Sequence, residues 1–216
     1  MRTSRVYTEE GGNRPEMDIE KINYLYGIDF PNRKIVPGEG NPRSNILLIG
    51  EAPGREEEAQ GRPFVGKAGK NLAEFLDLIK LKREDIFITN AVKFRPTKLS
   101  EYGSVSNRTP TENEVADYLP YLKLEIESVD PKIIVTLGNT PLRALVGNSI
   151  FVGKCHGKLQ EYGSRKLYPL YHPASLIYNP ALKGAYQEDV LKLRKLLDQY
   201  GIESREPEEI AEQLSW

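Results

Sequence analysis

The sequence predicts an α/β fold, with one three-layer domain in which helices flank a central four-stranded parallel sheet. Four short apolar runs have the composition of strands that are covered on both faces. Amphipathic helical patterns separate these runs along the chain. Strands that alternate with helices form a parallel sheet with helices on both of its faces. The 216 residues contain no repeat and no low-complexity linker, so we expect one domain over 1–216, with its core at about 36–200.

The expected strands are short, and the first three are rich in β-branched residues. Their sequences are "NILLIG" (45–50), "IFITN" (86–90), "KIIVTLG" (132–138) and "KLYPLY" (166–171). The first three do not alternate strictly between apolar and polar residues, as a strand with one face in water would.

The expected helices follow from the spacing of their apolar residues and from their terminal residues. The segment 69–81 places Leu72, Phe75, Leu76 and Ile79 on one face. The segment 109–129 opens with Pro110 and a capping box that joins Thr111 to Glu114. Two further helices at 139–147 and 185–201 end at glycines, and accessory helices are expected at about 15–27 and 206–215.

Composition excludes several classes of protein. The chain is 39% apolar and 28% charged, and no apolar run approaches the roughly 20 residues that a membrane span needs. The N-terminus has no apolar core of a secretory signal. One cysteine, Cys155, cannot form an intramolecular disulfide or a cysteine-only metal site. We expect a cytoplasmic protein that is a monomer and has no membrane partner.

The predicted sheet places a candidate site at the carboxyl ends of its strands, where ligands bind in open parallel sheets. Glu51, Ala52 and Gly54 follow the first strand, Asn90 ends the second, and His172 follows the fourth. Phe64 lies in the loop after the first strand, between Pro63 and Gly66. A carboxylate, an amide, an imidazole and an aromatic ring are therefore expected at one edge.

Each candidate also has a purely structural interpretation. His172 could cap the turn before Pro173, Asn90 could form a turn, and Phe64 could fill the core. The acidic run "REEEAQ" suits a solvated helix start. The glycine-rich stretch matches neither a Walker loop nor G-x-G-x-x-G, which argues against a nucleotide-phosphate site. The amide of Asn90 offers one acceptor and two donors, which suits the edge of a nucleobase.

Five motifs in order resemble the uracil-DNA glycosylase superfamily, and most closely its family 4, a prokaryotic branch. They are "GEAPGREEEAQGRPFVGKAG", "ITNAVKFRP", "NRTPTENEV", "IIVTLG" and "YHPASLIYNPALK", within about Val36 to Leu197. The resemblance implies a monofunctional enzyme that flips uracil out of single- or double-stranded DNA and hydrolyses its N-glycosidic bond. The open alternatives are a non-catalytic binder of damaged or abasic DNA, a glycosylase for another deaminated base such as hypoxanthine, and, more remotely, a small-molecule enzyme.

The resemblance also implies roles for individual residues. Phe64 would stack on uracil, Asn90 would bind its O4 and N3 edge, and His172 would stabilise negative charge at O2. Glu51, Ala52 and Gly54 would line the pocket near the water and the sugar, with Glu51 in a catalytic role. Leu176 would insert into the DNA stack. The other residues expected to contact DNA are Ser175, Lys93, Arg95 and Arg108.

The chain departs from the family pattern where family-4 enzymes carry four cysteines that hold a [4Fe–4S] cluster. The matching positions are Asn23, Tyr26, Phe94 and Tyr118. We therefore expect no iron–sulfur cluster and no other cofactor or metal, with aromatic side chains filling the volume. The loop at 97–110 is also longer than the family's usual link.

Net charge is −1, so any attraction to DNA must be local. Basic residues gather in segments predicted near the candidate site. Besides those already named for DNA contact, they are Lys98, Lys154, Lys158, Arg165, Lys166 and Lys183.

Overall fold

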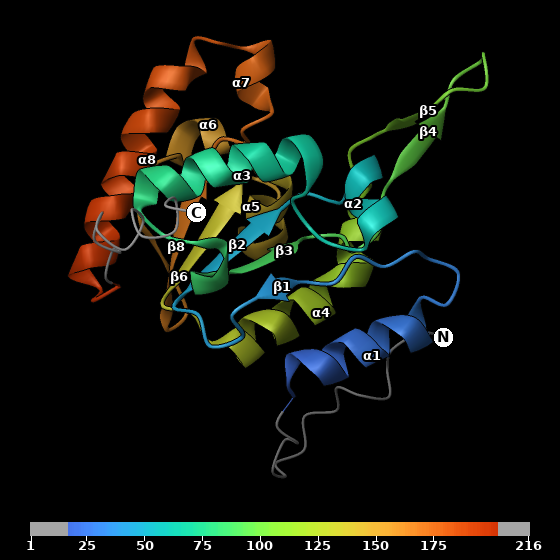
Figure 1. Ribbon diagram of the computed structural model, residues 1–216, viewed down its shortest axis with the longest axis horizontal. Coiled ribbons are helices and arrows are strands. Elements are labelled where there is room, and N and C mark those ends of the chain that lie inside the picture. Colours follow the sequence, from blue (N-terminus) through green and yellow to red (C-terminus); the bar gives the residue numbers. More distant parts are fainter. Residues whose placement is uncertain (1–16, 203–216) are drawn as a thin grey trace, which may run out of the picture.

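A six-stranded mixed sheet forms the centre of the structure, a computed structural model that describes residues 17–202 (Figure 1). The strand order is β1-β3-β2-β6-β8-β7. The four inner strands are parallel: β3 (Phe87–Asn90), β2 (Ile46–Gly50), β6 (Ile133–Leu137) and β8 (Arg165–Leu170). They are the four strands predicted from the apolar runs, so the predicted α/β class is confirmed. The edge strands β1 (Glu39–Gly40) and β7 (Gln160–Tyr162) are antiparallel additions that the sequence analysis missed.

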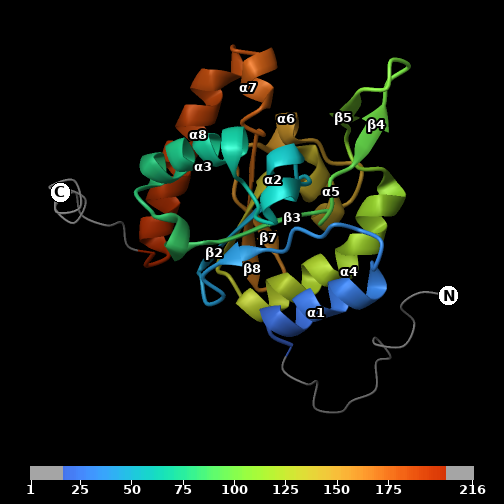
Figure 2. The same cartoon turned by 45° about the vertical axis from the view of Figure 1, so that its right-hand side comes forward.

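Helices cover both faces of this sheet. Side chains alternate between the faces along each strand, so Ile46 and Leu48 lie in one apolar cluster, and Leu47 and Ile49 in another. The first cluster contains α3 (Gly66–Ile79) and α8 (Leu182–Gln199). The second contains α4 (Glu112–Val129), α5 (Asn139–Val146) and α6 (Val152–Cys155). Figures 1 and 2 show these two helical layers on opposite sides of the strands.

The helix α1 (Ile19–Asp29) lies outside α4 rather than on the sheet (Figure 2). It begins where the Asp18 side chain accepts the backbone N–H of Lys21 at 2.8 Å. A third apolar cluster joins α1 to α4 through Tyr26, Tyr118 and Tyr121. The predicted leading helix is thus confirmed with shifted ends, whereas the helix expected at 206–215 lies outside the described residues.

Capping chemistry fixes the start of α4, as the sequence predicts. Thr111 Oγ1 accepts the backbone N–H of Glu114 at 3.2 Å, and Glu114 Oε2 accepts that of Thr111 at 2.8 Å. The run "REEEAQ" forms the short helix α2 (Arg55–Gln60), and the turn of 3₁₀-helix η1 (Arg83–Asp85) precedes β3. No helix within residues 17–202 is long and apolar enough to cross a membrane.

The long loop at 97–110 contains a β-hairpin that projects from the body of the protein (Figure 1). Its strands β4 (Thr97–Leu99) and β5 (Val105–Asn107) pair only with each other. Every residue of both strands is exposed, so no apolar periodicity could have predicted them.

Candidate active site

One cavity of about 410 Å³ opens at the carboxyl ends of the parallel strands. Such a volume is within the range of about 300–1,000 Å³ typical of small-molecule sites. Ala52, Gly54, Phe64, Asn90 and His172, which the sequence analysis expected at one edge, all line it. The remaining lining residues are Arg55, Glu56, Glu57, Lys67, Ala68, Asn71, Asn107, Ala174, Ile177 and Tyr178.

Phe64 is held in the cavity wall by an unusual backbone conformation. Its φ is +51°, a left-handed value that side-chain-bearing residues rarely adopt, and its side chain is buried. Arg83 Nη1 donates to the carbonyl of Phe64 at 3.0 Å, and Nη2 donates to that of Pro63 at 2.5 Å. These charge-assisted bonds stabilise a loop conformation that would otherwise be strained.

Glu57 fastens the same loop from inside. Its Oε2 accepts the backbone N–H of Gly54, and its Oε1 accepts that of Val65, both at 3.1 Å. The two ends of the loop that carries Phe64 are thereby joined through one buried carboxylate. The sequence analysis assigned Glu57 to a solvated helix start. The only sequence signal for its buried role is its position three residues after the glycine of the Pro-Gly turn, whose N–H it accepts.

Gly50 allows Phe64 and Asn90 to approach each other over the end of β2. It lies opposite Asn90 in the pairing of β2 with β3. A β-carbon at Gly50 would lie 2.4 Å from Asn90 Oδ1 and 2.5 Å from Phe64 Cζ. Any side chain there would therefore displace one or both groups. The only sequence signal for this role is a glycine that ends an apolar run.

Asn90 ends β3. Its side chain is buried, and the peptide group that follows it is hydrogen-bonded on both sides. The N–H of Ala91 donates to Gly50 O at 2.9 Å, and the carbonyl of Asn90 accepts from Lys93 Nζ at 2.5 Å. Lys93 was expected to contact DNA, and that prediction is wrong because its side chain is fully buried. Its ammonium also bonds Thr89 Oγ1 and Glu125 Oε2, inside the protein.

His172 follows β8 and presents one defined tautomer. Its Nδ1 accepts the backbone N–H of Ala174 at 3.1 Å, so the proton of the neutral ring is on Nε2. Burial lowers the pKa of His172 below its ordinary value, which favours this neutral form. Ser175 Oγ donates to the carbonyl of His172 at 2.6 Å, so this hydroxyl, expected at DNA, supports the histidine loop.

Glu51 does not line the cavity but lies beside it. Its Oε2 accepts a hydrogen bond from Thr140 Oγ1 of α5 at 2.7 Å, and its side chain is half-buried. The backbone carbonyl of Glu51 accepts the N–H of Val92 at 3.1 Å. A water held between Glu51 and the cavity would therefore share the Glu51 carboxylate with Thr140.

The remaining residues expected at DNA have varied surroundings. Arg95 Nε donates to Asn107 Oδ1 at 2.7 Å, and Asn107 lines the cavity. Arg108 forms a two-pronged ion pair with Glu114 at 2.7 Å for both bonds. Among the further basic residues, Arg165 and Lys166 begin β8 and so lie at the amino ends of the parallel strands. The site is at the carboxyl ends, so their predicted position near the site is wrong.

Leu176 is half-buried and packs against the apolar cluster of α3 and α8. The exposed apolar side chains of the short helix α7 (Ser175–Tyr178) are instead Ile177, 51% exposed, and Tyr178, 89% exposed. Both line the cavity. Sequence reasoning missed them because three apolar residues stand in a row, and the side that faces the core depends on the packing of α7.

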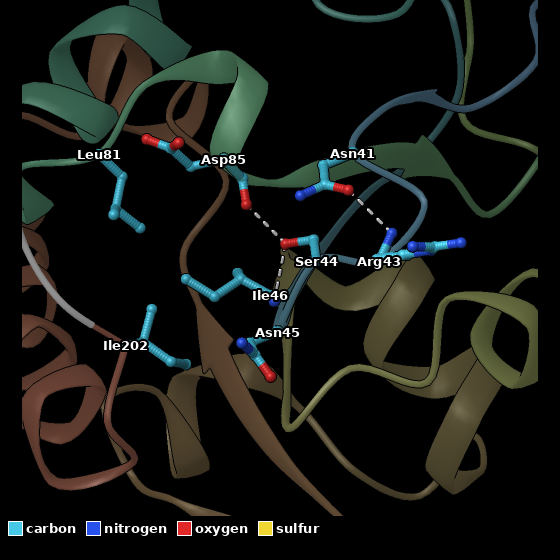
Figure 3. Close-up of a pocket in the computed structure, with 8 residues that line it drawn as sticks. All are labelled: Asn41, Arg43, Ser44, Asn45, Ile46, Leu81, Asp85 and Ile202. Atoms are coloured by element: carbon cyan, nitrogen blue, oxygen red, sulfur yellow. Dashed lines mark hydrogen bonds between the residues drawn. The ribbon is translucent and has the colours of Figure 1, made fainter.

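A second cavity, of about 160 Å³, lies at the amino ends of the strands and is separate from this site (Figure 3). Ser44 Oγ donates to Asp85 O at 2.7 Å and accepts the N–H of Ile46 at 3.0 Å. The Ser44 hydroxyl is therefore bonded both as a donor and as an acceptor within the protein. His156, the other histidine, does not line the candidate site. Its Nδ1 forms a hydrogen bond with Asp189 Oδ2, and the two atoms are 2.5 Å apart.

Three of the four positions that the family resemblance aligns with cluster cysteines belong to one aromatic cluster, whereas the fourth, Asn23, is a polar residue of α1. The ring centroids of Tyr26 and Phe94 lie 6.2 and 5.7 Å from that of Tyr118, and Phe30 stacks on Tyr118 at 4.2 Å. No thiolate is present there, since Cys155 is on α6. Within residues 17–202 no group of three or more His, Cys, Asp or Glu could hold a metal ion. The residues present do not fit an iron–sulfur cluster.

Comparisons with known proteins identify the family of the chain. Residues 37–195 match the family described as the uracil DNA glycosylase superfamily. The chain is 41% identical to a type-4 uracil-DNA glycosylase of Saccharolobus solfataricus, over 76% of this chain and 77% of that protein. It is 38% identical to one of Thermotoga maritima, over 77% and 85%. The crystal structure of Pedobacter heparinus SMUG2 shares the fold, with a TM-score of 0.56 and 14% identity over 85% of this chain and 99% of that chain.

Proposed function

Because this chain belongs to the uracil DNA glycosylase superfamily and to its type-4 branch, we propose that it excises uracil from DNA in DNA repair. The observation that carries the proposal is the cavity at the carboxyl edge of the sheet. It brings an aromatic ring, an amide and a neutral imidazole to one place, on Phe64, Asn90 and His172. These are the three kinds of group that hold a flipped base and stabilise it as it leaves.

Each of the three side chains has one task in this proposal. Phe64 stacks on the face of the flipped base, which binds any base without regard to its edge. Asn90 accepts the N3–H of uracil and donates to O4, whereas cytosine has an acceptor at N3 and a donor at C4. An amide in one fixed orientation leaves mismatched buried polar groups with cytosine and so rejects it.

The chemistry requires stabilisation of a leaving anion. The bond between C1′ and N1 breaks, its electron pair leaves with uracil, and the sugar gains oxocarbenium character. Nε2–H of His172 donates to O2, where negative charge accumulates. Water then adds to C1′ and loses its proton to solvent, which leaves an abasic site. Lys67 lines the cavity, but none of the residues given a catalytic role is a lysine, so strand cleavage through an imine is not part of the proposal.

We also propose that the enzyme works without an iron–sulfur cluster. The packed rings of Tyr26, Phe94 and Tyr118 support this proposal, because they occupy the positions at which such a cluster would need thiolates. Iron analysis of purified protein, with its visible absorption spectrum, tests it. A protein without iron and without a cluster band is expected, whereas about four irons per chain would contradict it.

The further partners are proposed on the same basis. DNA binding follows from the proposed activity, and single- or double-stranded DNA that contains uracil is the expected substrate of a monomeric enzyme. A cytoplasmic location would give the enzyme access to chromosomal DNA in a prokaryote.

A glycosylase assay tests the proposed function. The protein and its His172→Ala variant are incubated with a labelled oligonucleotide that carries one uracil, single-stranded or opposite G or A. Alkali then reveals abasic sites. Loss of one preorganised donor costs roughly 10²–10³ in rate, so the variant should be slower by that factor. No uracil release by the wild type, with binding retained, would instead support a binding module or another deaminated base.

A further inference from the structure

A closed network of buried polar groups lies directly behind Asn90. Lys93 Nζ donates to Thr89 Oγ1 and Asn90 O, both at 2.5 Å, and to Glu125 Oε2 at 2.7 Å. Thr89 Oγ1 donates to Glu125 Oε2 at 2.9 Å, and Tyr26 OH donates to Glu125 Oε1 at 3.1 Å. We call these four side chains, of Tyr26, Thr89, Lys93 and Glu125, the Lys93 network.

The Lys93 network buries two charges, which costs free energy, but the ammonium of Lys93 has a full set of hydrogen bonds. The side chains of Lys93 and Glu125 are 0% and 1% exposed, and charges buried to this extent lose their hydration. Burial lowers the pKa of Lys93, and the carboxylate of Glu125 opposes this effect. An ammonium has three protons, and all three have acceptors here. Apolar residues of similar volume could fill the same space, so packing alone does not account for the ion pair.

The network acts on the one peptide group that follows the side chain at the cavity. The N–H of the Asn90–Ala91 peptide bonds Gly50 O of the neighbouring strand at 2.9 Å. Its carbonyl bonds the ammonium of Lys93 on the opposite side. This peptide is thus held from both directions at the point where β3 ends, by one bond from the neighbouring strand and one from Lys93. Its orientation sets the direction in which the Asn90 side chain leaves the backbone.

We propose that Lys93, held in place by Glu125, is a positioning residue for base recognition: it fixes the Asn90–Ala91 peptide and with it the orientation of the Asn90 amide. The inference rests on the proposed function, because it assumes that Asn90 binds the edge of the base. Lys93 touches neither the cavity nor DNA, and acts only through Asn90. Tyr26 extends this support to α1 and to the aromatic cluster.

A double-mutant cycle tests the proposal. The variant Lys93→Met/Glu125→Gln removes both charges together, so neither is left buried without its partner. A misplaced amide costs up to ~10²-fold, so we expect kcat/KM for uracil excision to fall by about 10- to 100-fold. The same double substitution in an Asn90→Ala background should cost less than about 3-fold, because the group that it positions is already gone.

The controls separate positioning from loss of stability. Val129→Ala removes buried volume from the same helix, α4, outside the network, and its effect on kcat/KM should be equal in both backgrounds. If Lys93→Met/Glu125→Gln does not fold, Tyr26→Phe removes only the outermost hydrogen bond and should show a smaller loss of about 2- to 5-fold with the same dependence on Asn90. All assays are run well below the melting temperature of each variant.

The outcomes distinguish this inference from the proposed function. Equal losses in the wild-type and Asn90→Ala backgrounds would overturn the positioning role and make the Lys93 network purely structural. Full activity of the charge-free variant would also overturn it. An Asn90→Ala variant as active as wild type would instead remove the assumed role of Asn90, and a wild type that releases no uracil would remove the proposed function itself.

Discussion

Gly50→Ala adds a single methyl group between the two side chains that are proposed to hold the base. That carbon would lie 2.4 Å from Asn90 Oδ1 and 2.5 Å from Phe64 Cζ. Ordinary contacts are 3.4–4 Å long, so each group must recede by about 1 Å. A shift of about 1 Å at a reacting site costs roughly 10²-fold in rate, and we expect that loss in kcat/KM.

The two groups have little freedom to recede without such a loss. The backbone of Phe64 is fixed by Arg83 and by Glu57 through Val65, and the peptide after Asn90 is bonded on both sides. Overpacking of a dense core costs about 1–3 kcal/mol. At about 2–4 °C per kcal/mol for a chain of this size, the melting temperature should fall by roughly 2–12 °C, which leaves the protein folded at 25 °C.

Uracil release under single-turnover conditions, together with thermal unfolding, measures both effects. Gly27→Ala is the matched control, because no atom lies within 4 Å of its added carbon and its φ is not positive. In a helix this exchange should raise stability by about 0.5–1 kcal/mol and leave the rate unchanged. Wild-type activity in folded Gly50→Ala would refute the argument that close contact over Gly50 sets the geometry of the site.

Three further predictions concern titration and packing. Because burial lowers the pKa of His172, the folded state binds fewer protons than the unfolded state, so the free energy of unfolding should fall as pH drops below about 6.5. Urea unfolding at about pH 5 and pH 7.5 measures this fall, which should be smaller for His172→Gln than for the wild type. Hydrogen bonds from Arg108 are the main cause that lowers the pKa of Glu114 from 4.5 to about 2. In the same urea unfolding experiment, Glu114→Gln should lower the free energy of unfolding by about 1 kcal/mol at pH 7 and leave it unchanged near pH 2. The buried hydroxyl of Tyr118 has no hydrogen-bond partner among the described residues, so Tyr118→Phe should unfold at the same or a higher temperature, whereas Tyr118→Ala should cost about 3–5 kcal/mol.

The inner sheet and its helices could be predicted because their own side chains specify them. Ile133 and Val135 pack on one face of β6 and Ile134 packs on the other. Consecutive apolar residues therefore indicate a strand that is buried on both faces. The edge strand β1 has only two residues and exists because β3 offers it a free edge. The hairpin at 97–107 is held by its own ladder and by Ser100, whose hydroxyl accepts the N–H of Ser104. Neither pattern is visible in hydrophobic periodicity.

The candidate site was predictable as far as strand ends determine it. Asn90 and His172 could be placed at one edge because parallel strands end together. The burial of Lys93 could not be predicted, since Lys93 lies in the loop after β3 and its partner Glu125 is 32 residues away on α4. Its neighbours in sequence suggest a basic surface, and a single distant carboxylate reverses that interpretation.

The proposed absence of an iron–sulfur cluster and the proposed site are connected in the structure through Tyr26. Its ring belongs to the aromatic cluster, 5.0 Å from the ring of Tyr121, and its hydroxyl belongs to the Lys93 network. Burial of a large side chain contributes about 1.5–3 kcal/mol, and an aromatic pair about 0.5–1.5 kcal/mol more. Several such rings can join α1 to α4 without a metal. Since apolar packing tolerates small shifts and a saturated ion pair does not, the rings supply the cohesion while Lys93 and Glu125 transmit a defined position to Asn90.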